Sequence, residues 1–277
     1  MCVCHSHLWA GLFGLGFNKP MTFIAPNPST LVSPPTTKAL RLVVGAGGGL
    51  GQAWLQLLQD QDANNPSQAQ PLSQSVGLSR STAPAIDYTQ PNTIGQAATW
   101  LQQHMASAGA QLRQVVVATG YLHSELGQPE RSLRQLDAHY LQHVMQVNAI
   151  GPALLLGALA PLLPRQGRVV LAAVSAKVGS IGDNALGGWY GYRASKAALN
   201  QFVKTASIEL RRHNKDAICV ALHPGTVDTG LSAPFAKTGL KVRPPSVAAS
   251  ELQAVLDGLS AAHNGSFFDY QGQALPW

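Results

Sequence analysis

The sequence contains few cysteines, and this scarcity excludes a fold that depends on disulfides. Its 277 residues include three cysteines, of which Cys219 lies inside an apolar, strand-like run. Structural disulfides are typical of oxidising compartments, so we expect a cytoplasmic protein, or an organellar one if residues 1–38 are a targeting segment. Cys2 and Cys4 lie beside two histidines, but this terminal cluster has no second group of ligands elsewhere, and no metal site is predicted.

Long runs of one charge and long apolar segments are also missing. Lysine and arginine total 19 against 13 acidic residues, but they are scattered and are not interleaved with aromatic side chains. A nucleic-acid partner is therefore not expected, although the net charge of +6 suits an anionic cofactor. The apolar stretch 8–17 is shorter than the roughly 20 residues of a membrane helix, and no lysine or arginine precedes it as in a signal peptide. We therefore expect no membrane partner.

Composition divides the chain near residue 38. Residues 1–38 combine an apolar stretch with a proline-, serine- and threonine-rich one, which predicts a flexible or targeting-like N-terminal extension. Residues 39–277 are enough for a single α/β domain with a substantial core. Within them, the stretch 61–74 is rich in glutamine, asparagine and serine, which indicates a long exposed loop.

From residue 40 onward, short apolar runs alternate with longer helical stretches. This alternation predicts an α/β fold, in which a parallel sheet has helices on both faces. The expected strands are 40–44, 75–78, 112–118, 168–174, 217–222 and 267–270. The expected helices are 51–59, 93–106, 132–163 with a break near Gly151-Pro152, 192–213, and 247–261 after a cap at Ser246.

A glycine-rich turn follows the first expected strand directly and leads into a helix. Gly45, Gly49 and Gly51 lie in this turn, with Leu50 between the last two. Because glycine has no Cβ, backbone N–H groups and the helix N-terminus can approach a pyrophosphate closely. The order strand, glycine turn, helix therefore predicts a dinucleotide site, the alternative being a flexible turn that binds nothing.

Tyr192 and Lys196 lie four residues apart in a predicted helix. At this spacing two side chains share one helix face, with Cβ atoms about 5–6 Å apart. A neighbouring ammonium lowers the pKa of a phenol from its ordinary value of about 10, which makes the phenol a usable proton donor. Taken alone, the pair is also typical of an aromatic ring lying beside a solvated lysine stem.

Together, the two motifs resemble those of the short-chain dehydrogenase/reductase family. The glycines fit G-x-x-x-G-x-G, and Tyr-x-x-x-Lys follows about 150 residues downstream. The resemblance covers residues 39–277, and the stretches 180–189 and 265–272 are similar to the C-factor-like and sniffer-type carbonyl reductase branch. It implies a single-domain, Rossmann-type doubly wound sheet, a nicotinamide cofactor and a small carbonyl or alcohol substrate, and we expect a homodimer or homotetramer.

The resemblance implies an NADP site in preference to an NAD site. The family's cofactor-selecting position falls on Arg80, whose guanidinium can pair with a 2′-phosphate, whereas a carboxylate there would bond the free hydroxyl of NAD. Asp87 matches the family's adenine-contacting aspartate, and Thr229 would contact the nicotinamide carboxamide. The implied cofactor-binding set is Gly45, Gly49, Leu50, Gly51, Arg80, Asp87, Gly120, Tyr192, Lys196, Pro224, Gly225, Val227 and Thr229.

The resemblance also implies a catalytic set for hydride transfer between NADP(H) and a carbonyl. Tyr192 would donate a proton to the carbonyl oxygen, and Lys196 would lower the pKa of Tyr192 and bond the nicotinamide ribose. Asn148 matches the family's helix asparagine, which would hold a water for proton relay. Tyr190 is expected to line the substrate pocket, and His223 is expected to be a strand-end residue and not a base.

The serine that polarises the carbonyl in this family is displaced here. The matched position is Ala176, with Ser175 one residue earlier and Ser180 four residues later. A slip of one residue in a strand turns a side chain to the opposite face, so the displacement matters. Ser175 is our prediction for the polarising group, and Ser180 or no serine at all are the alternatives.

A different class of function stays open at this point. The displaced serine and the loss of the family's Asn-Asn-Ala-Gly pattern, of which Gly120 alone remains, are compatible with an NADP-binding sensor or interaction protein that turns over little. A sugar-nucleotide epimerase is disfavoured, because too little chain follows Thr229 for a separate substrate domain.

Overall fold

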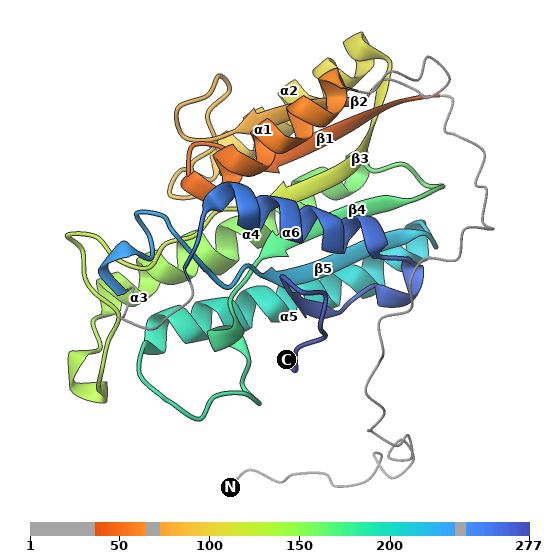
Figure 1. The fold of residues 1–277 in the computed structure, drawn as a ribbon. Coiled ribbons are helices and arrows are strands. Elements are labelled where there is room, and N and C mark those ends of the chain that lie inside the picture. Colours follow the sequence, from red (N-terminus) through yellow and green to blue (C-terminus); the bar gives the residue numbers. More distant parts are fainter. Residues whose placement is uncertain (1–36, 65–72, 236–241) are drawn as a thin grey trace, which may run out of the picture.

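The computed structural model describes residues 37–64, 73–235 and 242–277, and a six-stranded parallel sheet forms its centre (Figure 1). The strand order is β2-β1-β3-β4-β5-β8. The strands are β1 (Lys38–Val44), β2 (Ser73–Leu78), β3 (Ala110–Val117), β4 (Val169–Val174), β5 (Ala217–His223) and β8 (Phe267–Asp269); β6 (Thr226–Val227) and β7 (Val242–Arg243) form a separate small pair. The chain passes from β1 outward to β2 and then back past β1 to β3, so the direction of winding reverses beside β1.

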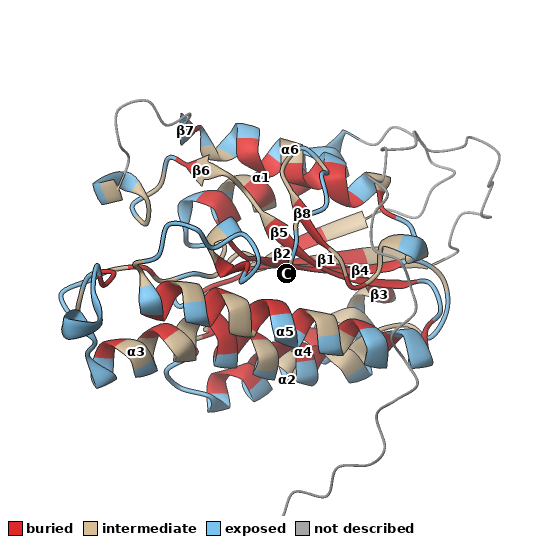
Figure 2. Cartoon of the chain, turned by 90° about the horizontal axis from the view of Figure 1, so that it is seen from below, coloured by how far each residue is buried: buried red, intermediate tan, exposed pale blue. Residues whose placement is uncertain are grey.

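Helices cover both faces of the sheet (Figure 2). The helices α1 and α6 lie over one face, and α2, α4 and α5 lie over the other. The helices are α1 (Gly49–Ala63), α2 (Asn92–Ala108), α3 (Ala138–Met145), α4 (Gly151–Leu159), α5 (Tyr190–His213) and α6 (Pro245–Gly258). Short 3₁₀ turns lie at Leu133–Gln135, Ala160–Leu162, Lys177–Gly179, Ala233–Phe235 and Ala261–His263.

Strand β4 shows why both faces are covered. All of its residues are buried, and successive side chains point to opposite faces. Leu171 and Ala173 pack into the core under α2, α4 and α5, whereas Val170 and Ala172 pack into the core under α1 and α6. A strand that is apolar on both faces is stable only between two layers of helices, which is the α/β arrangement that the sequence predicts.

The predicted α/β fold with its doubly wound parallel sheet is confirmed. Each of the six expected strands is present, and its bounds differ from the predicted ones by at most two residues. The proposed N-terminal extension falls mainly on residues 1–36, which lie outside the described residues. The expected loop 61–74 is corrected at both ends, because residues 61–63 belong to α1 and residues 73–74 to β2. Residues 65–72 lie outside the described residues. The division of the chain at residue 38 therefore stays a prediction.

Two predictions about helix boundaries are corrected. Helix α6 begins at Pro245, and Ser246 lies within its first turn without a capping hydrogen bond, so Ser246 is not the cap. The helix expected over 132–163 begins later, at Ala138, because the Asp137 carboxylate accepts the N–H of Tyr140 and caps the helix there. The break expected near Gly151-Pro152 is a π-helical segment, Gln146–Ile150, that joins α3 to α4.

One helical run among the described residues, Ala138–Leu162, is long and apolar enough to cross a membrane by length and composition alone. In this fold, apolar side chains of the run contact protein and not lipid, because Leu155 and Leu159 are buried in the core against the sheet. The composition of this run is therefore explained by core packing in the α/β layers.

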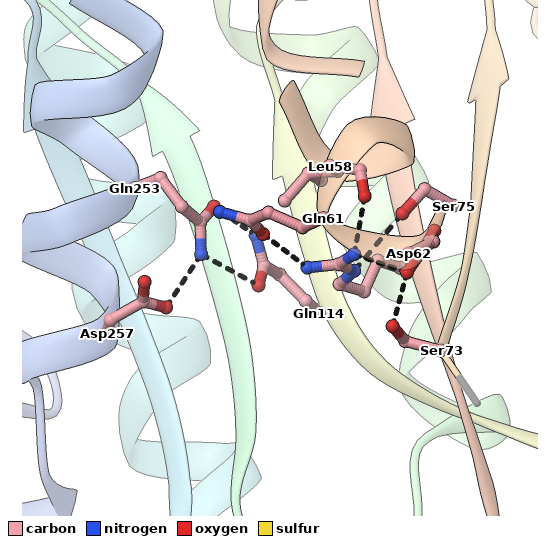
Figure 3. Close-up of polar contacts among 9 residues, drawn as sticks. Leu58, Gln61, Asp62, Ser73, Ser75, Gln114, Gln253 and Asp257 are labelled. Carbon is pink, nitrogen blue, oxygen red and sulfur yellow. Dashed lines mark hydrogen bonds and ion pairs between the residues drawn. The ribbon is translucent and has the colours of Figure 1, made fainter. Parts of the chain in front are cut away.

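Two polar networks, one buried and one partly buried, connect helices to the sheet (Figure 3). In the first, the side-chain oxygen of Gln253 on α6 accepts hydrogen bonds from Trp54 Nε1 of α1 and Gln114 Nε2 of β3, both at 2.8 Å. In the second, Arg41 of β1 donates to Ser75 of β2 at 3.1 Å and also to the end of α1. These bonds satisfy polar groups that the helices would otherwise bury without partners.

Gln253 should therefore matter for stability. We expect Gln253→Ala to lower the free energy of unfolding by about 2–4 kcal/mol, because two buried donors lose their acceptor. Gln56→Ala is the control, since it removes an exposed bond on α1 and should cost less than about 0.5 kcal/mol. Urea unfolding of both variants measures the difference, and equal losses would contradict this account of the network.

Candidate active site

The candidate site lies at the edge of the sheet where the parallel strands end. Two adjoining cavities of about 450 and 780 Å³ open there, and both are bordered by Gly48, Ala118, Thr119 and Gly120. The predicted site residues that border the smaller cavity are Gly49, Leu50, Gly120, Ser175, Tyr192, Lys196, Pro224, Gly225, Val227 and Thr229. Those that border the larger cavity are Gly45, Arg80, Asp87 and Gly120, which leaves Gly51 and Asn148 behind the cavity walls.

The glycine turn joins β1 to α1 with no space for side chains at its key positions. A Cβ on Gly51 would lie 2.2 Å from the carbonyl oxygen of Gly45, and a Cβ on Gly49 would lie 2.9 Å from Thr229 Cγ2. Helix α1 begins at Gly49, and the N–H groups of its first turn have no partners inside the helix. The turn therefore presents N–H donors and the positive end of a helix to an anion.

At the end of β2, Arg80 and two serine hydroxyls border the larger cavity. The hydroxyls of Ser79 and Ser81 lie 3.0 Å apart, and Arg80 lies between them in the sequence. Partial burial favours the neutral form of Asp87, but hydrogen bonds from Thr89 and the charge of Arg80 outweigh it and hold the pKa of Asp87 below its ordinary value. A guanidinium, two hydroxyls and a carboxylate suit the phosphate and adenosine parts of a nucleotide.

Thr119 borders both cavities. Its Oγ1 is buried beside the equally buried hydroxyl of Tyr88, so these two polar groups face each other and do not call for a ligand. The fit to a dinucleotide depends on the glycine turn and on Arg80. The first N–H groups of α1 have no partners inside the helix, and Arg80 borders the larger cavity, so the residues present suit the phosphates of a dinucleotide.

Tyr192 and Lys196 lie in the first turns of α5 and face the smaller cavity. Lys196 Nζ lies 5.9 Å from the centre of the Tyr192 ring and donates a hydrogen bond of 2.9 Å to the carbonyl oxygen of Val174. Burial lowers the pKa of Lys196 to about 8 and raises the pKa of Tyr192 above its ordinary value. The expected lowering of the tyrosine pKa is therefore corrected for the protein alone, because burial outweighs the effect of the ammonium.

Asn148 lies in the π-helical segment, completely buried. Its amide exchanges two hydrogen bonds with the backbone of Tyr121, at 2.7 and 2.8 Å, and donates a third to Ser195 Oγ of α5. A Cβ on Gly120 would lie 3.8 Å from Lys196 Nζ and 4.0 Å from Asn148 Oδ1, so these three residues meet at one point. The predicted role of Asn148 in holding a water stays a prediction.

Ser175 borders the smaller cavity, as predicted for a site residue, but it is already hydrogen-bonded within the protein. Its hydroxyl donates a hydrogen bond of 2.6 Å to Asn200 Oδ1 of α5. The role of Ser175 in polarising a carbonyl therefore stays a prediction. Ser180 is also occupied, because its hydroxyl donates to the carbonyl oxygen of Trp277. Ala176, which the resemblance matches to the polarising serine, belongs to the buried apolar cluster that contains Tyr192 and Leu122.

The segment that follows β5 forms the far wall of the smaller cavity. Gly225 has φ +72, and a Cβ there would lie 2.6 Å from the guanidinium of Arg243. Arg243 stacks on Tyr270 at 3.3 Å and forms an ion pair with Glu251 at 3.0 Å. The side chains of Arg243 and Tyr270 therefore pack against the backbone at Gly225 and support the segment from Pro224 to Thr229.

Three cavity residues were missed by the sequence motifs: Trp189, Phe235 and Leu122 border the smaller cavity together with Tyr192. Nothing in their spacing marks them, since they come from three separate loops. The expectation for Tyr190 is corrected, because Tyr190 is not among the residues that border either cavity. His223 ends β5 as expected, and burial lowers its pKa to about 4, which keeps the imidazole neutral at pH 7.

Comparisons with known proteins assign this site to a family. The profile of the short chain dehydrogenase family matches residues 40–239. C-signal of Myxococcus xanthus is 38% identical over 147 residues, which cover 53% of this chain and 84% of that protein. The 1-hydroxy-2-glutathionyl-2-methyl-3-butene dehydrogenase of Rhodococcus sp. is 30% identical over 196 residues, which cover 70% of this chain and 79% of that protein.

Solved structures have the same fold. The carbonyl reductase Sniffer of D. melanogaster superimposes with a TM-score of 0.69 at 22% identity, covering 87% of this chain and 99% of that chain. A Burkholderia multivorans protein with bound NADP superimposes with a TM-score of 0.67 at 25% identity, covering 87% of this chain and all of that chain. The chain belongs to the short-chain dehydrogenase family, and the predicted family and enzyme class, a short-chain dehydrogenase/reductase, are confirmed.

Burial of Lys196 makes the stability depend on pH. Its pKa is about 8 in the folded protein against an ordinary 10.5, so between these values the unfolded chain binds more protons and the free energy of unfolding rises with pH. We expect a rise of the order of 3 kcal/mol across this window. Lys196→Met should lack this rise, because it has no ammonium to desolvate.

Urea unfolding of both proteins between pH 7 and 10.5 measures this effect. The difference between their free energies of unfolding isolates Lys196 from other groups that titrate in the same window. If wild type and Lys196→Met show the same pH dependence of the free energy of unfolding, the pKa of Lys196 is not lowered by burial.

Proposed function

We propose that the chain is an NADP(H)-dependent reductase of a small carbonyl substrate. The observation that carries this proposal is the composition of the smaller cavity, where Tyr192 and Lys196 border the same space as the glycine turn and the Thr229 segment. A proton donor and an anion-binding backbone thus adjoin one volume of small-molecule size. The likeness to the Rhodococcus dehydrogenase supports the same class of reaction.

NADP is favoured over NAD by the residues at the end of β2. Arg80, Ser79 and Ser81 offer a positive charge and two hydroxyls to a 2′-phosphate. No acidic residue stands beside Arg80 in the sequence to bond a free ribose hydroxyl, and Asp87 borders the cavity farther along the chain. The bound NADP of the Burkholderia multivorans protein agrees with this assignment.

In the proposed reaction, residues of this chain supply the proton and stabilise the negative charge that develops. When bound, NADPH supplies the hydride that turns the carbonyl carbon into that of an alcohol. Tyr192 gives its hydroxyl proton to the carbonyl oxygen as negative charge develops there. The Lys196 ammonium stabilises the tyrosinate that remains, and Asn148 and Gly120 shape the point from which a water returns the proton.

Because of Ala176, the proposed site offers one hydrogen-bond donor fewer to the substrate carbonyl than the family's site, which has a serine at this position. Ser175 and Ser180 are occupied by bonds within the protein, and Ala176 contributes a methyl group beside Tyr192. Of these four residues, Tyr192 is therefore the one that we expect to donate a hydrogen bond to the carbonyl oxygen. A hydroxyl at position 176 would add a second donor at the position where charge develops.

Self-association is proposed on separate grounds. Several apolar side chains on the outer surface of α4 and α5 are 39–52% exposed, namely Ile150, Leu154, Phe202 and Ile208. The first of these lies where the π-helical segment meets α4, and α4 packs beside α5, so the four side chains belong to neighbouring elements. Apolar surface of this kind favours burial against a second copy of the chain, as a homodimer or homotetramer.

The proposed reaction predicts a specific loss in Tyr192→Phe. We expect wild-type protein to oxidise NADPH with some members of a panel of aldehydes and ketones, and the variant to lose roughly 100-fold or more in kcat. NADPH binding should change by less than about threefold, because the lost hydroxyl acts on the substrate and not on the glycine turn. Tyr190→Phe is the matched control, since its ring borders neither cavity.

Ala176→Ser separates an enzyme from a sensor. If the site is catalytic, the added hydroxyl should raise kcat, by up to about 100-fold where carbonyl polarisation limits the rate. A wild-type protein that binds NADPH but reduces no carbonyl, with Tyr192→Phe and Ala176→Ser indistinguishable from it, would favour the NADP-binding sensor.

Arg80 should set the preference between the two cofactors. We expect Arg80→Ala to weaken NADPH binding roughly ten- to a hundredfold, because a charge-assisted bond to the 2′-phosphate is lost. NADH binding should change less than about twofold, and Arg134→Ala, which alters an exposed arginine outside both cavities, should leave both affinities unchanged. Cofactor fluorescence titrations of wild type and both variants measure the six affinities, and parallel losses for NADPH and NADH in Arg80→Ala would contradict the assignment.

A further inference from the structure

Trp189 is held in a backbone conformation that its residue type rarely adopts. Its φ is +53, and it is the one residue other than glycine with a positive φ in the described ranges. It follows Gly187 and Gly188, whose φ values are +65 and +67. A bulky residue in the left-handed region persists only when its surroundings fix it, and such residues gather at functional sites.

Glu130 fixes this conformation from one side. It is 2% exposed, its carbonyl oxygen accepts the N–H of Trp189 at 2.5 Å, and its carboxylate accepts the N–H of Gly191 at 3.0 Å. A Cβ on Gly191 would lie 3.0 Å from the Glu130 carboxylate, so the close approach needs glycine there. A buried carboxylate at the start of α5 is also favoured by the partial positive charge of the helix N-terminus.

Arg193 fixes the same turn from the other side. Its guanidinium donates to the carbonyl oxygens of Gly188 at 2.9 Å, Gly187 at 3.1 Å and Val178 at 3.2 Å. Its backbone N–H also donates to the Trp189 carbonyl at 2.8 Å. The turn that carries Trp189 is thus bonded to the loop after β4 and to the start of α5 at once.

These bonds orient the indole toward the substrate side of the smaller cavity. The indole meets the ring of Tyr192 at 6.1 Å and 75°, and the ring of Phe235 at 5.2 Å and 67°. Leu122, Ala176 and Tyr192 form one buried cluster, and Trp189 packs against it. The space beside the Tyr192 hydroxyl is therefore walled by aromatic and aliphatic surface.

We propose that Trp189 determines substrate choice by selecting carbonyl compounds that carry a flat aromatic ring, and that Glu130 is the positioning residue that aims it. The inference rests on the proposed carbonyl reduction and names the substrate class for it. An aromatic ring can meet the indole edge to face in addition to burying apolar area, whereas a saturated ring of similar size can only bury area. Trp189, Phe235 and Leu122 carry no charge with which a charged substituent could pair.

The test uses two substrates with the same aldehyde group: 3-phenylpropanal and 3-cyclohexylpropanal. Two methylene groups separate each ring from the carbonyl, so the intrinsic reactivity of the aldehydes is matched. We expect wild-type protein with NADPH to prefer the phenyl compound in kcat/KM by roughly two- to tenfold, the factor that an aromatic pair contributes. In Trp189→Leu the ratio should fall to about one, with the KM for NADPH unchanged.

Controls separate the specificity effect from a loss of folding. Trp100→Leu makes the same change on α2, away from both cavities, and should keep the wild-type ratio. Glu130→Ala should reduce the ratio toward one, whereas Glu130→Gln keeps an acceptor for Gly191 and should restore most of it. Melting temperatures and NADPH affinity establish that each variant is folded.

Two kinds of failure are distinguishable. If no aldehyde in a broad panel is reduced, the proposed function is wrong, and the substrate class falls with it. If both aldehydes are reduced but the ratio is the same in wild-type and Trp189→Leu, the function stands and the role of Trp189 is overturned. A full wild-type ratio in folded Glu130→Ala would overturn the positioning role of Glu130.

Discussion

The buried ammonium of Lys196 is the constraint on which the rest of the site depends. A charge in a mainly apolar interior is unfavourable unless hydrogen bonds replace its water, and Lys196 Nζ donates one to the Val174 carbonyl at the end of β4. That bond joins α5 to the end of β4, and α5 also lies close to the turn after β4, because a Cβ on Gly179 would lie 2.6 Å from Lys196 Cβ. The lowered pKa, about 8, records that the ammonium is only partly compensated. A nucleotide ribose in the adjoining cavity would complete its hydrogen bonding.

The first turn of α5 connects the chemistry of the site to its shape. Tyr192 and Trp189 lie three residues apart, so a rotation of this turn would move the proton donor and the apolar wall together. Glu130 and Arg193 bond the turn from opposite sides and prevent that rotation. Polar groups of Lys196 and the glycine turn therefore border one part of the smaller cavity, and the apolar side chain of Trp189 borders another. Helix α5 positions both Lys196 and Trp189.

Features that depend on local sequence could be predicted, and features that depend on long-range contacts could not. The apolar strands and the glycine turn with its helix follow from residue period and from the need for missing Cβ atoms, and the structure contains them. The serine was harder, because a difference of one residue at a strand end decides between Ser175, which bonds Asn200, and a methyl group beside Tyr192. Trp189 and its contact with Glu130 join positions 59 residues apart, and no spacing rule marks such a pair. The tyrosine pKa was wrong in direction because helical spacing gives the distance to a charge but not the depth of burial.

Ala176 links these observations through the balance of charge during reaction. In the proposed reaction a second donor on the developing oxyanion would typically be worth roughly 10² to 10³ in rate, and the family resemblance puts Ala176, with its methyl group, at that position. An apolar wall strengthens the remaining hydrogen bond from Tyr192, because few waters compete for it. The same burial raises the pKa of Tyr192 and makes it a weaker acid. These two effects oppose each other, and in the proposed reaction the positive charge of Lys196 beside Tyr192 would favour proton transfer. With alanine at position 176, the proposed reaction would depend on Lys196 more strongly than a reaction in which a serine shares the developing negative charge.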